Sequence, residues 1–215
     1  MTNLVLKYRQ KKWANIFVIY LRYLIGGAFV FSSIPKIAGQ RFTSDNCESA
    51  PIDTWMHFFE TLYRSGIYWD FLGWGQLLAG LILMTQLYST LGALIFLPII
   101  LNVFVITISY KMTGTIVIAG LMLLANIFLV LWDNHKIVIL LLPERRTEIK
   151  IASRYDEFYN NAFWAWLGLI LFVTTALYVV RLGSNPMFWF LICVIEGLIG
   201  LIYLNIKTRR SRILG

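Results

Sequence analysis

Hydrophobic residues are arranged along this chain in six long runs that are separated by polar segments. The runs cover residues 14–34, 70–87, 90–110, 115–132, 162–181 and 187–206. A helix needs about 20 apolar residues to cross the ~30 Å hydrocarbon layer of a bilayer. Backbone polar groups in lipid must be hydrogen-bonded internally, so each run is predicted to be an α-helix. The pattern therefore predicts an all-α, polytopic membrane bundle of six transmembrane helices.

The polar segment between the first two runs, residues 35–69, contains a predicted amphipathic helix. Thr54–Arg64 places apolar side chains largely on one helical side, namely Trp55, Phe58, Phe59, Leu62 and Tyr63, and places His57, Glu60 and Arg64 on another. A helix of this kind lies in the plane of the membrane interface. We expect it to lie on the external face.

A second non-spanning segment, 133–161, begins with the short apolar stretch Ile137–Leu142, which ends at Pro143. Six apolar residues are too few to span a bilayer, so we expect this stretch to pack against the end of the bundle. The predicted organisation is a four-helix membrane domain over 1–142, a charged cytoplasmic linker over 143–161, and a two-helix membrane extension over 162–215.

The composition agrees with lipid as the main solvent of the chain. Hydrophobic residues make up 59% of the 215 residues, charged residues make up 14%, and the mean hydropathy is +0.70. A soluble domain carries about 25% charged residues. The net charge of +8 comes from basic residues beside the apolar runs, which favours membrane orientation over nucleic-acid binding.

Lysine and arginine are distributed unequally between the two sides, and this bias predicts the orientation. With both termini in the cytoplasm, the inner segments hold Lys7, Arg9, Lys11, Lys12, Lys136, Arg145, Arg146, Lys150, Arg154, Lys207, Arg209, Arg210 and Arg212, against Lys36, Arg41, Arg64, Lys111 and Arg181 outside. The first run ends at Ile34–Pro35–Lys36 without a small-residue cleavage site, so it is predicted to be an uncleaved span. We expect a multi-pass protein of a bacterial inner membrane.

Residues 22–36 resemble the opening helix of the DoxX-like membrane proteins. The segment has Arg22, a glycine four residues later at Gly26, aromatic and small residues, and a Pro35–Lys36 exit. Residues 75–83 are similar to the second helix of that family, and a tight turn over 86–90 leads into the third. The resemblance covers about residues 14–140 and implies a four-helix DoxX-like core to which the last two helices are an addition.

The chain departs from this family at Gln76, where the second helix usually carries a glutamate. The motif Gln76-x-x-x-Gly80-Leu-Ile is similar to Glu196-x-x-x-Gly200-Leu-Ile in the sixth helix. If the two segments are a repeat, the sixth helix supplies the carboxylate that the second lacks. Some members of the family are associated with quinone-linked sulfur oxidation, so the resemblance names quinone or lipid as candidate ligands.

Polar side chains within the spans form the candidate site. An ionised group at the centre of a bilayer costs from ~3 to more than 10 kcal/mol, so Glu196 is expected to face the protein interior with a polar partner. The expected intramembrane polar network comprises Glu196, Gln76, Asn102, Asn126 and Arg22. The alternatives are interhelical hydrogen bonding for the amides, a neutral structural carboxyl for Glu196, and snorkelling for Arg22. If Arg22 points inward, Glu196 and Asp133 are its two candidate partners.

No motif in the sequence indicates catalysis or metal binding. His57 and His135 lie at different interfaces, and Cys47 and Cys193 lie in a loop and a span, so neither a metal site nor a disulfide is expected. Three functions remain open. The chain is a non-catalytic subunit or scaffold of a membrane complex, an accessory subunit of a quinone-linked oxidoreductase, or a small proton-coupled carrier that uses Glu196. As an accessory subunit it would bind a lipophilic ligand near the external amphipathic helix, in a groove lined by aromatic residues of 54–74.

Overall fold

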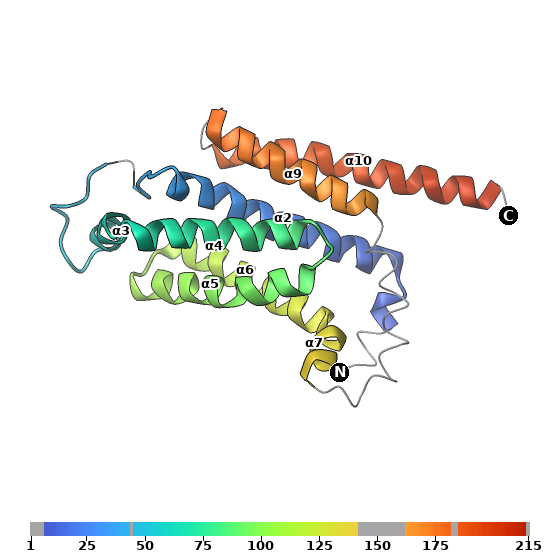
Figure 1. The fold of residues 1–215 in the computed structure, drawn as a ribbon, viewed down its shortest axis with the longest axis horizontal. Helices are drawn as coiled ribbons and strands as arrows, with labels where there is room; N and C mark the ends of the chain where they lie inside the picture. Colours follow the sequence, from blue (N-terminus) through green and yellow to red (C-terminus); the bar gives the residue numbers. More distant parts are fainter. Residues whose placement is uncertain (1–6, 44, 142–161, 182–184, 214–215) are drawn as a thin grey trace.

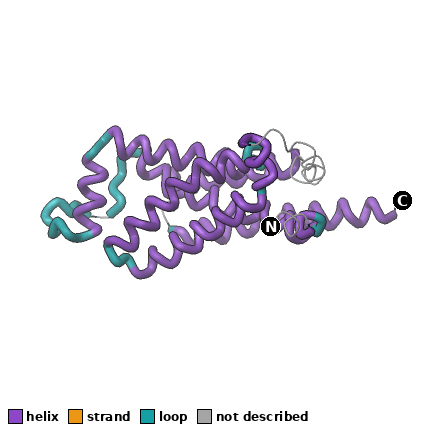
Figure 2. Tube along the Cα trace, turned by 90° about the horizontal axis from the view of Figure 1, so that it is seen from below, coloured by secondary structure: helices purple, strands orange, loops and turns teal. Residues whose placement is uncertain are grey.

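The computed structural model describes residues 7–43, 45–141, 162–181 and 185–213, with side chains undescribed over 138–141 and 207–213. The predicted linker 143–161 lies outside the described residues. Described in chain order, the helices are α2 (Lys12–Ile37), α3 (Trp55–Arg64), α4 (Ile67–Met84), α5 (Ser89–Ser109), α6 (Thr113–Trp132), α7 (Asn134–Leu141), α9 (Ala162–Arg181) and α10 (Pro186–Ile213). The described part of the chain contains no strand, as Figure 2 shows.

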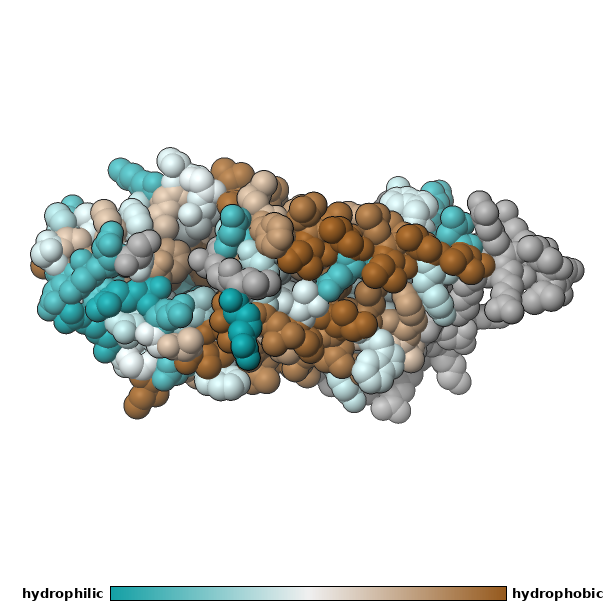
Figure 3. Space-filling view, turned by 90° about the horizontal axis from the view of Figure 1, so that it is seen from above, coloured by the Kyte–Doolittle hydropathy of each residue, from teal (hydrophilic) through white to brown (hydrophobic). Residues whose placement is uncertain are grey.

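Six of these helices are long and apolar enough to cross a membrane: α2, α4, α5, α6, α9 and α10. They lie roughly side by side, and the apolar surface residues gather over their middle part (Figures 1 and 3). The predicted all-α membrane bundle is therefore confirmed. The main differences in bounds are that α4 runs over Ile67–Met84 rather than over 70–87, and that α10 continues to Ile213.

Helix α2 is the central element of the bundle. In its most apolar window 56% of the residues are buried, against 17% in α6 and in α10. Helices α9 and α10 lie on one side of α2, and α5 and α6 lie on the other (Figure 1). The lateral surfaces of α6 and α10 are apolar and exposed, as expected where lipid is the solvent.

Glycines allow the close helix contacts on which this arrangement depends. A Cβ atom on Gly26 of α2 would lie 2.9 Å from the carbonyl oxygen of Gly80 in α4. A Cβ atom on Gly80 would lie 2.8 Å from the carbonyl oxygen of Gly26. On the other side, Gly168 of α9 lies so close to the carbonyl group of Met84 that a Cβ atom there would overlap it. Small residues therefore bring three backbones together, as is common in membrane bundles.

Helix α3 lies across the end of the bundle opposite to the end where α2 begins and α10 ends (Figure 1). It coincides with the predicted amphipathic helix, and Thr54 caps it by accepting a hydrogen bond from the backbone N–H of His57. The end that carries α3 is also the most hydrophilic part of the surface in Figure 3. This position matches that expected of an interfacial helix.

Candidate functional site

A buried cluster of charged and polar side chains joins several segments at the end of the bundle where α2 begins. Asp133, the residue after α6, is its centre. Its Oδ2 accepts hydrogen bonds from Arg22 Nη2 at 2.6 Å and from Thr90 Oγ1 at 3.0 Å, and its Oδ1 accepts one from Arg9 Nη2 at 3.2 Å. The aspartate therefore ties α2, α5 and the segment before α2 to the end of α6.

The cluster continues beyond Asp133 on both arginines. Arg22 Nη1 donates to Gln86 Oε1 at 2.9 Å, in the turn between α4 and α5. Arg9 Nη1 lies 3.1 Å from Nε2 of His135. A guanidinium can only donate, so this ring nitrogen is the acceptor. The arginine side chain also lies over the ring of Trp132, with its Cζ atom 5.8 Å from the ring centroid.

Burial gives these ion pairs their structural importance. The side chains of Arg9, Arg22 and Asp133 are each 1% exposed. Removing one member of a buried pair leaves an uncompensated charge and typically costs about 3–5 kcal/mol. The geometry of these contacts suits holding the ends of the helices together.

The backbone at Gln86 contributes to this geometry. Its φ of 62° lies in the left-handed region, which residues other than glycine seldom adopt. The conformation ends α4 and begins the turn into α5 while the side chain is 98% covered and reaches Arg22. The turn expected from the sequence over 86–90 is thus the element that delivers Gln86 and Thr90 to the cluster.

Arg22 is not paired with Glu196, one of the partners considered for it, and is paired with Asp133, the other. Glu196 lies on α10 and faces α9, where its Oε1 accepts a hydrogen bond from Thr174 Oγ1 at 2.7 Å. Its Oε2 is buried without a hydrogen-bond partner among the described residues. Because α10 packs on α9, the carboxyl does not reach the polar residues of the four-helix core.

The three amides of the expected network are also separated from one another. Asn126 of α6 is fully buried and donates to the backbone carbonyl of Ala93 in α5 at 3.1 Å, which joins these two helices. Gln76 is buried in α4, and its Oε1 has no hydrogen-bond partner in the described structure. Asn102 of α5 is exposed on the outside of the bundle.

A second charged group lies at the α3 end. Glu60 is 3% exposed and accepts hydrogen bonds from Arg64 Nε at 3.0 Å and from Arg41 Nε at 3.1 Å. Arg64 also donates to Glu48 at 2.6 Å. The Arg64 and Arg41 guanidinium groups lower the pKa of Glu60, and hydrogen bonds to Glu60 and Glu48 raise that of Arg64. These pairs fasten the loop before α3 to the helix, so the expected polar side of α3 is covered at Glu60.

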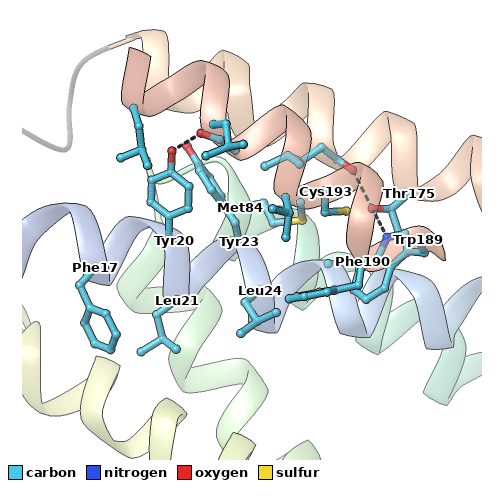
Figure 4. A pocket seen from close by; sticks show the side chains of 16 residues that line it. Phe17, Tyr20, Leu21, Tyr23, Leu24, Met84, Thr175, Trp189, Phe190 and Cys193 are labelled. Atoms are coloured by element: carbon cyan, nitrogen blue, oxygen red, sulfur yellow. Dashed lines mark hydrogen bonds between the residues drawn. The ribbon is translucent and has the colours of Figure 1, made fainter. Parts of the chain in front are cut away.

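A cavity of about 380 Å³ lies between α2, α9 and α10 (Figure 4). Its wall includes Tyr20, Leu24, Trp189, Cys193 and Val194, and Met84 of α4 contributes at the back. The sequence suggested that aromatic residues of 54–74, close to α3, line a groove for a lipophile. The cavity described here lies elsewhere, because it is formed where the last two helices meet α2.

Cys47 and Cys193 are both free thiols in the structure. Within the described residues, no three His, Cys, Asp or Glu side chains come together as a metal site requires. A scan against protein-family models finds no match, and searches of curated proteins and of solved structures find none either. The likeness to DoxX-like proteins therefore stays a prediction.

Proposed function

We propose that this polytopic membrane protein is a non-catalytic subunit of a membrane complex, and that the face of α5 around Asn102 receives a transmembrane helix of a partner subunit. The observation that carries the proposal is the position of the Asn102 amide. It lies within a membrane-spanning helix, it is exposed on the outer side of the bundle, and it forms no hydrogen bond with the described part of the chain.

An amide in hydrocarbon is stabilised when it forms a hydrogen bond with another helix. Lipid chains offer no hydrogen bonds, and asparagine bonds between transmembrane helices each contribute roughly 0.6–2 kcal/mol. Asn102 belongs to a stripe of exposed residues at helical spacing, formed by Leu91, Ile95, Pro98, Asn102 and Val105. This stripe presents one continuous face of α5, which a second helix can cover along its length while it bonds to the amide.

The proposal also includes the orientation of the protein in the membrane, with both termini in the cytoplasm. Six spans place the start of α2 and the end of α10 on one side, and the excess of lysine and arginine there supports a cytoplasmic location. The α3 end then faces outward. In a variant with Cys193→Ser, labelling of Cys47 by a membrane-impermeant maleimide from outside intact cells supports this orientation. Labelling only after the inner face is opened contradicts it.

The carrier interpretation has less support from the geometry. Glu196 lies in the seam between α9 and α10, on the side of α2 opposite α5 and α6, and bonds to Thr174 there. A carrier that moves protons through the four-helix core needs its acid inside that core. The subunit interpretation instead explains why a polar amide lies on the outside of α5.

Site-specific photocrosslinking in native membranes tests the proposal. A photoreactive amino acid at Val105 should give an adduct of higher mass with another membrane protein, and Asn102→Leu should abolish it. The same photoreactive residue at Val117, which is 61% exposed on α6, is the matched control and should give no such adduct. Equal adducts from both positions, or an adduct of twice the monomer mass, would overturn the proposed partner subunit.

A further inference from the structure

We infer that the cavity between α2, α9 and α10 holds one acyl chain of a membrane phospholipid, which fills the space between the four-helix core and the last two helices. The inference does not depend on the proposed subunit role, because the cavity and the Asn102 face lie on different helices. It rests on the lining of the cavity, on its opening and on its size.

Polar groups in the cavity wall are already bonded within the protein. The Tyr20 hydroxyl donates to the carbonyl of Gly197, and the Tyr23 hydroxyl donates to the carbonyl of Trp164 at 2.5 Å. Trp189 Nε1 donates to Thr175 Oγ1 at 3.0 Å, and that hydroxyl donates to the carbonyl of Leu171 at 2.7 Å (Figure 4). These hydroxyl and indole hydrogens are therefore not available to a ligand.

This pattern of hydrogen bonding favours a hydrocarbon chain over a quinone ring. Ligand sites orient polar ligands with a few convergent polar groups, and a quinone carbonyl entering this cavity would meet only the weak Cys193 thiol as a donor. A chain of methylene groups needs no donor. Apolar cavities of this kind stay dry and bind apolar molecules.

The cavity opens on the side of the bundle that faces the acyl chains of the bilayer. Leu24 of α2 is 48% exposed, and Val194 and Leu198 of α10 are 41% and 50% exposed, although all three belong to the lining. They lie in membrane-spanning helices, so the medium outside this rim is the acyl region of the bilayer. Phospholipid chains are therefore the ligand present there at the highest concentration.

The size of the cavity also fits a chain. Its volume of about 380 Å³ is more than twice that of the ~150 Å³ apolar cavity that binds benzene. Around it, side chains bridge α2 and α10, and the rings of Phe31 and Trp189 lie with their centroids 5.0 Å apart. A bound chain would complete the packing between these helices, because voids in a protein interior lose contacts that neighbouring atoms would otherwise make.

Native mass spectrometry of the purified full-length protein tests the inference. We expect the wild type to retain one phospholipid after the other lipids have been stripped. Val194→Trp fills the cavity from α10 and Leu24→Trp fills it from α2, and each should reduce the retained fraction by about tenfold or more. Ile195→Trp is the matched control, because Ile195 is 56% exposed on α10 outside the lining, and it should retain the phospholipid.

The mass of the retained molecule identifies the occupant. A quinone or another polyprenyl compound, an equal loss in the control, or full retention in both filled variants would overturn the inference.

A second measurement avoids large substitutions in the wall. With Cys47→Ser, Cys193 is the remaining cysteine, and its reaction with a small membrane-permeant maleimide should be slow with phospholipid bound, faster after delipidation, and slow again when phospholipid is restored. An unchanged rate would contradict the inference.

Discussion

Arg22 and Asp133 form a buried ion pair, in which Arg22 Nη2 and Asp133 Oδ2 are 2.6 Å apart and each side chain is 1% exposed. The two residues are separated by 111 positions in the sequence. Arg22 lies inside a span, where a lone guanidinium would be expensive, and Asp133 follows the last residue of α6. The pair therefore compensates an intramembrane charge and at the same time fixes the end of α6 against α2.

Asp133→Asn should destabilise the protein strongly. The substitution keeps the shape of the side chain but removes the negative charge that Arg22 and Arg9 contact at this position, so we expect a loss of about 3–5 kcal/mol in the free energy of unfolding. The melting temperature in detergent measures this loss. Asp53→Asn, at an exposed loop position, is the control and should change it little. Equal melting temperatures for Asp133→Asn and wild type would contradict a structural role for the cluster.

Gly168→Ala should loosen the contact between α9 and α4. The new Cβ would overlap the carbonyl group of Met84, so the helices must move apart. Overpacking of this kind costs about 1–3 kcal/mol. Gly75→Ala is the matched control, because no atom beyond its chain neighbours and the backbone of its own helix lies within 4 Å of its Cβ position. Thermal unfolding in detergent should show a lower transition for the first variant alone. If both variants unfold alike, the close approach of α9 is not needed.

Glu196→Gln and Glu196→Leu should behave differently. The carboxyl has one hydrogen bond, from Thr174, and no cationic partner among the described residues, so a neutral side chain suits the site. Glutamine keeps an acceptor for Thr174 and should leave the melting temperature unchanged. Leucine leaves the Thr174 hydroxyl without this acceptor and should lower stability by about 0.6–2 kcal/mol. A leucine variant as stable as wild type would show that the bond contributes nothing.

Protection of the segment before α3 should depend on pH through Glu60. Hydrogen bonds from Arg64 and Arg41 lower the pKa of Glu60 from its ordinary 4.5. A carboxyl with a lowered pKa stabilises the folded state above its ordinary pKa, and this contribution is lost as the pH falls through the lowered value. The protection factors of the backbone amides in residues 45–64 should therefore fall in acid below about pH 4.5. Glu60→Gln should remove this dependence, whereas Asp53→Asn should leave it intact.

The hydrophobic pattern was sufficient to predict the spans, because lipid requires long apolar helices with internal hydrogen bonds. Residues 162–181 were predicted as a span and form α9 with the same bounds. The turn at Gln86 was expected, but its left-handed backbone and the end of α4 at Met84 were not. Those details follow from the contact between Gln86 and Arg22, which no local pattern in the sequence reveals.

For the polar residues within the spans, the sequence gives the depth in the membrane but not the partner. The sequence by itself determined that Glu196, Arg22 and the amides need polar partners. The position of each residue within its apolar run sets its depth in the bilayer, and the depth sets the cost of removing its side chain from water. Only the tertiary structure decided the partners, because these depend on which helix faces which. Arg9 and Gln86 join the cluster at Asp133, Thr174 bonds Glu196, and Asn102 lies outside. The rotation of each helix about its axis is set by close packing at positions such as Gly26 and Gly168, and this packing depends on the shapes of all neighbouring side chains at once.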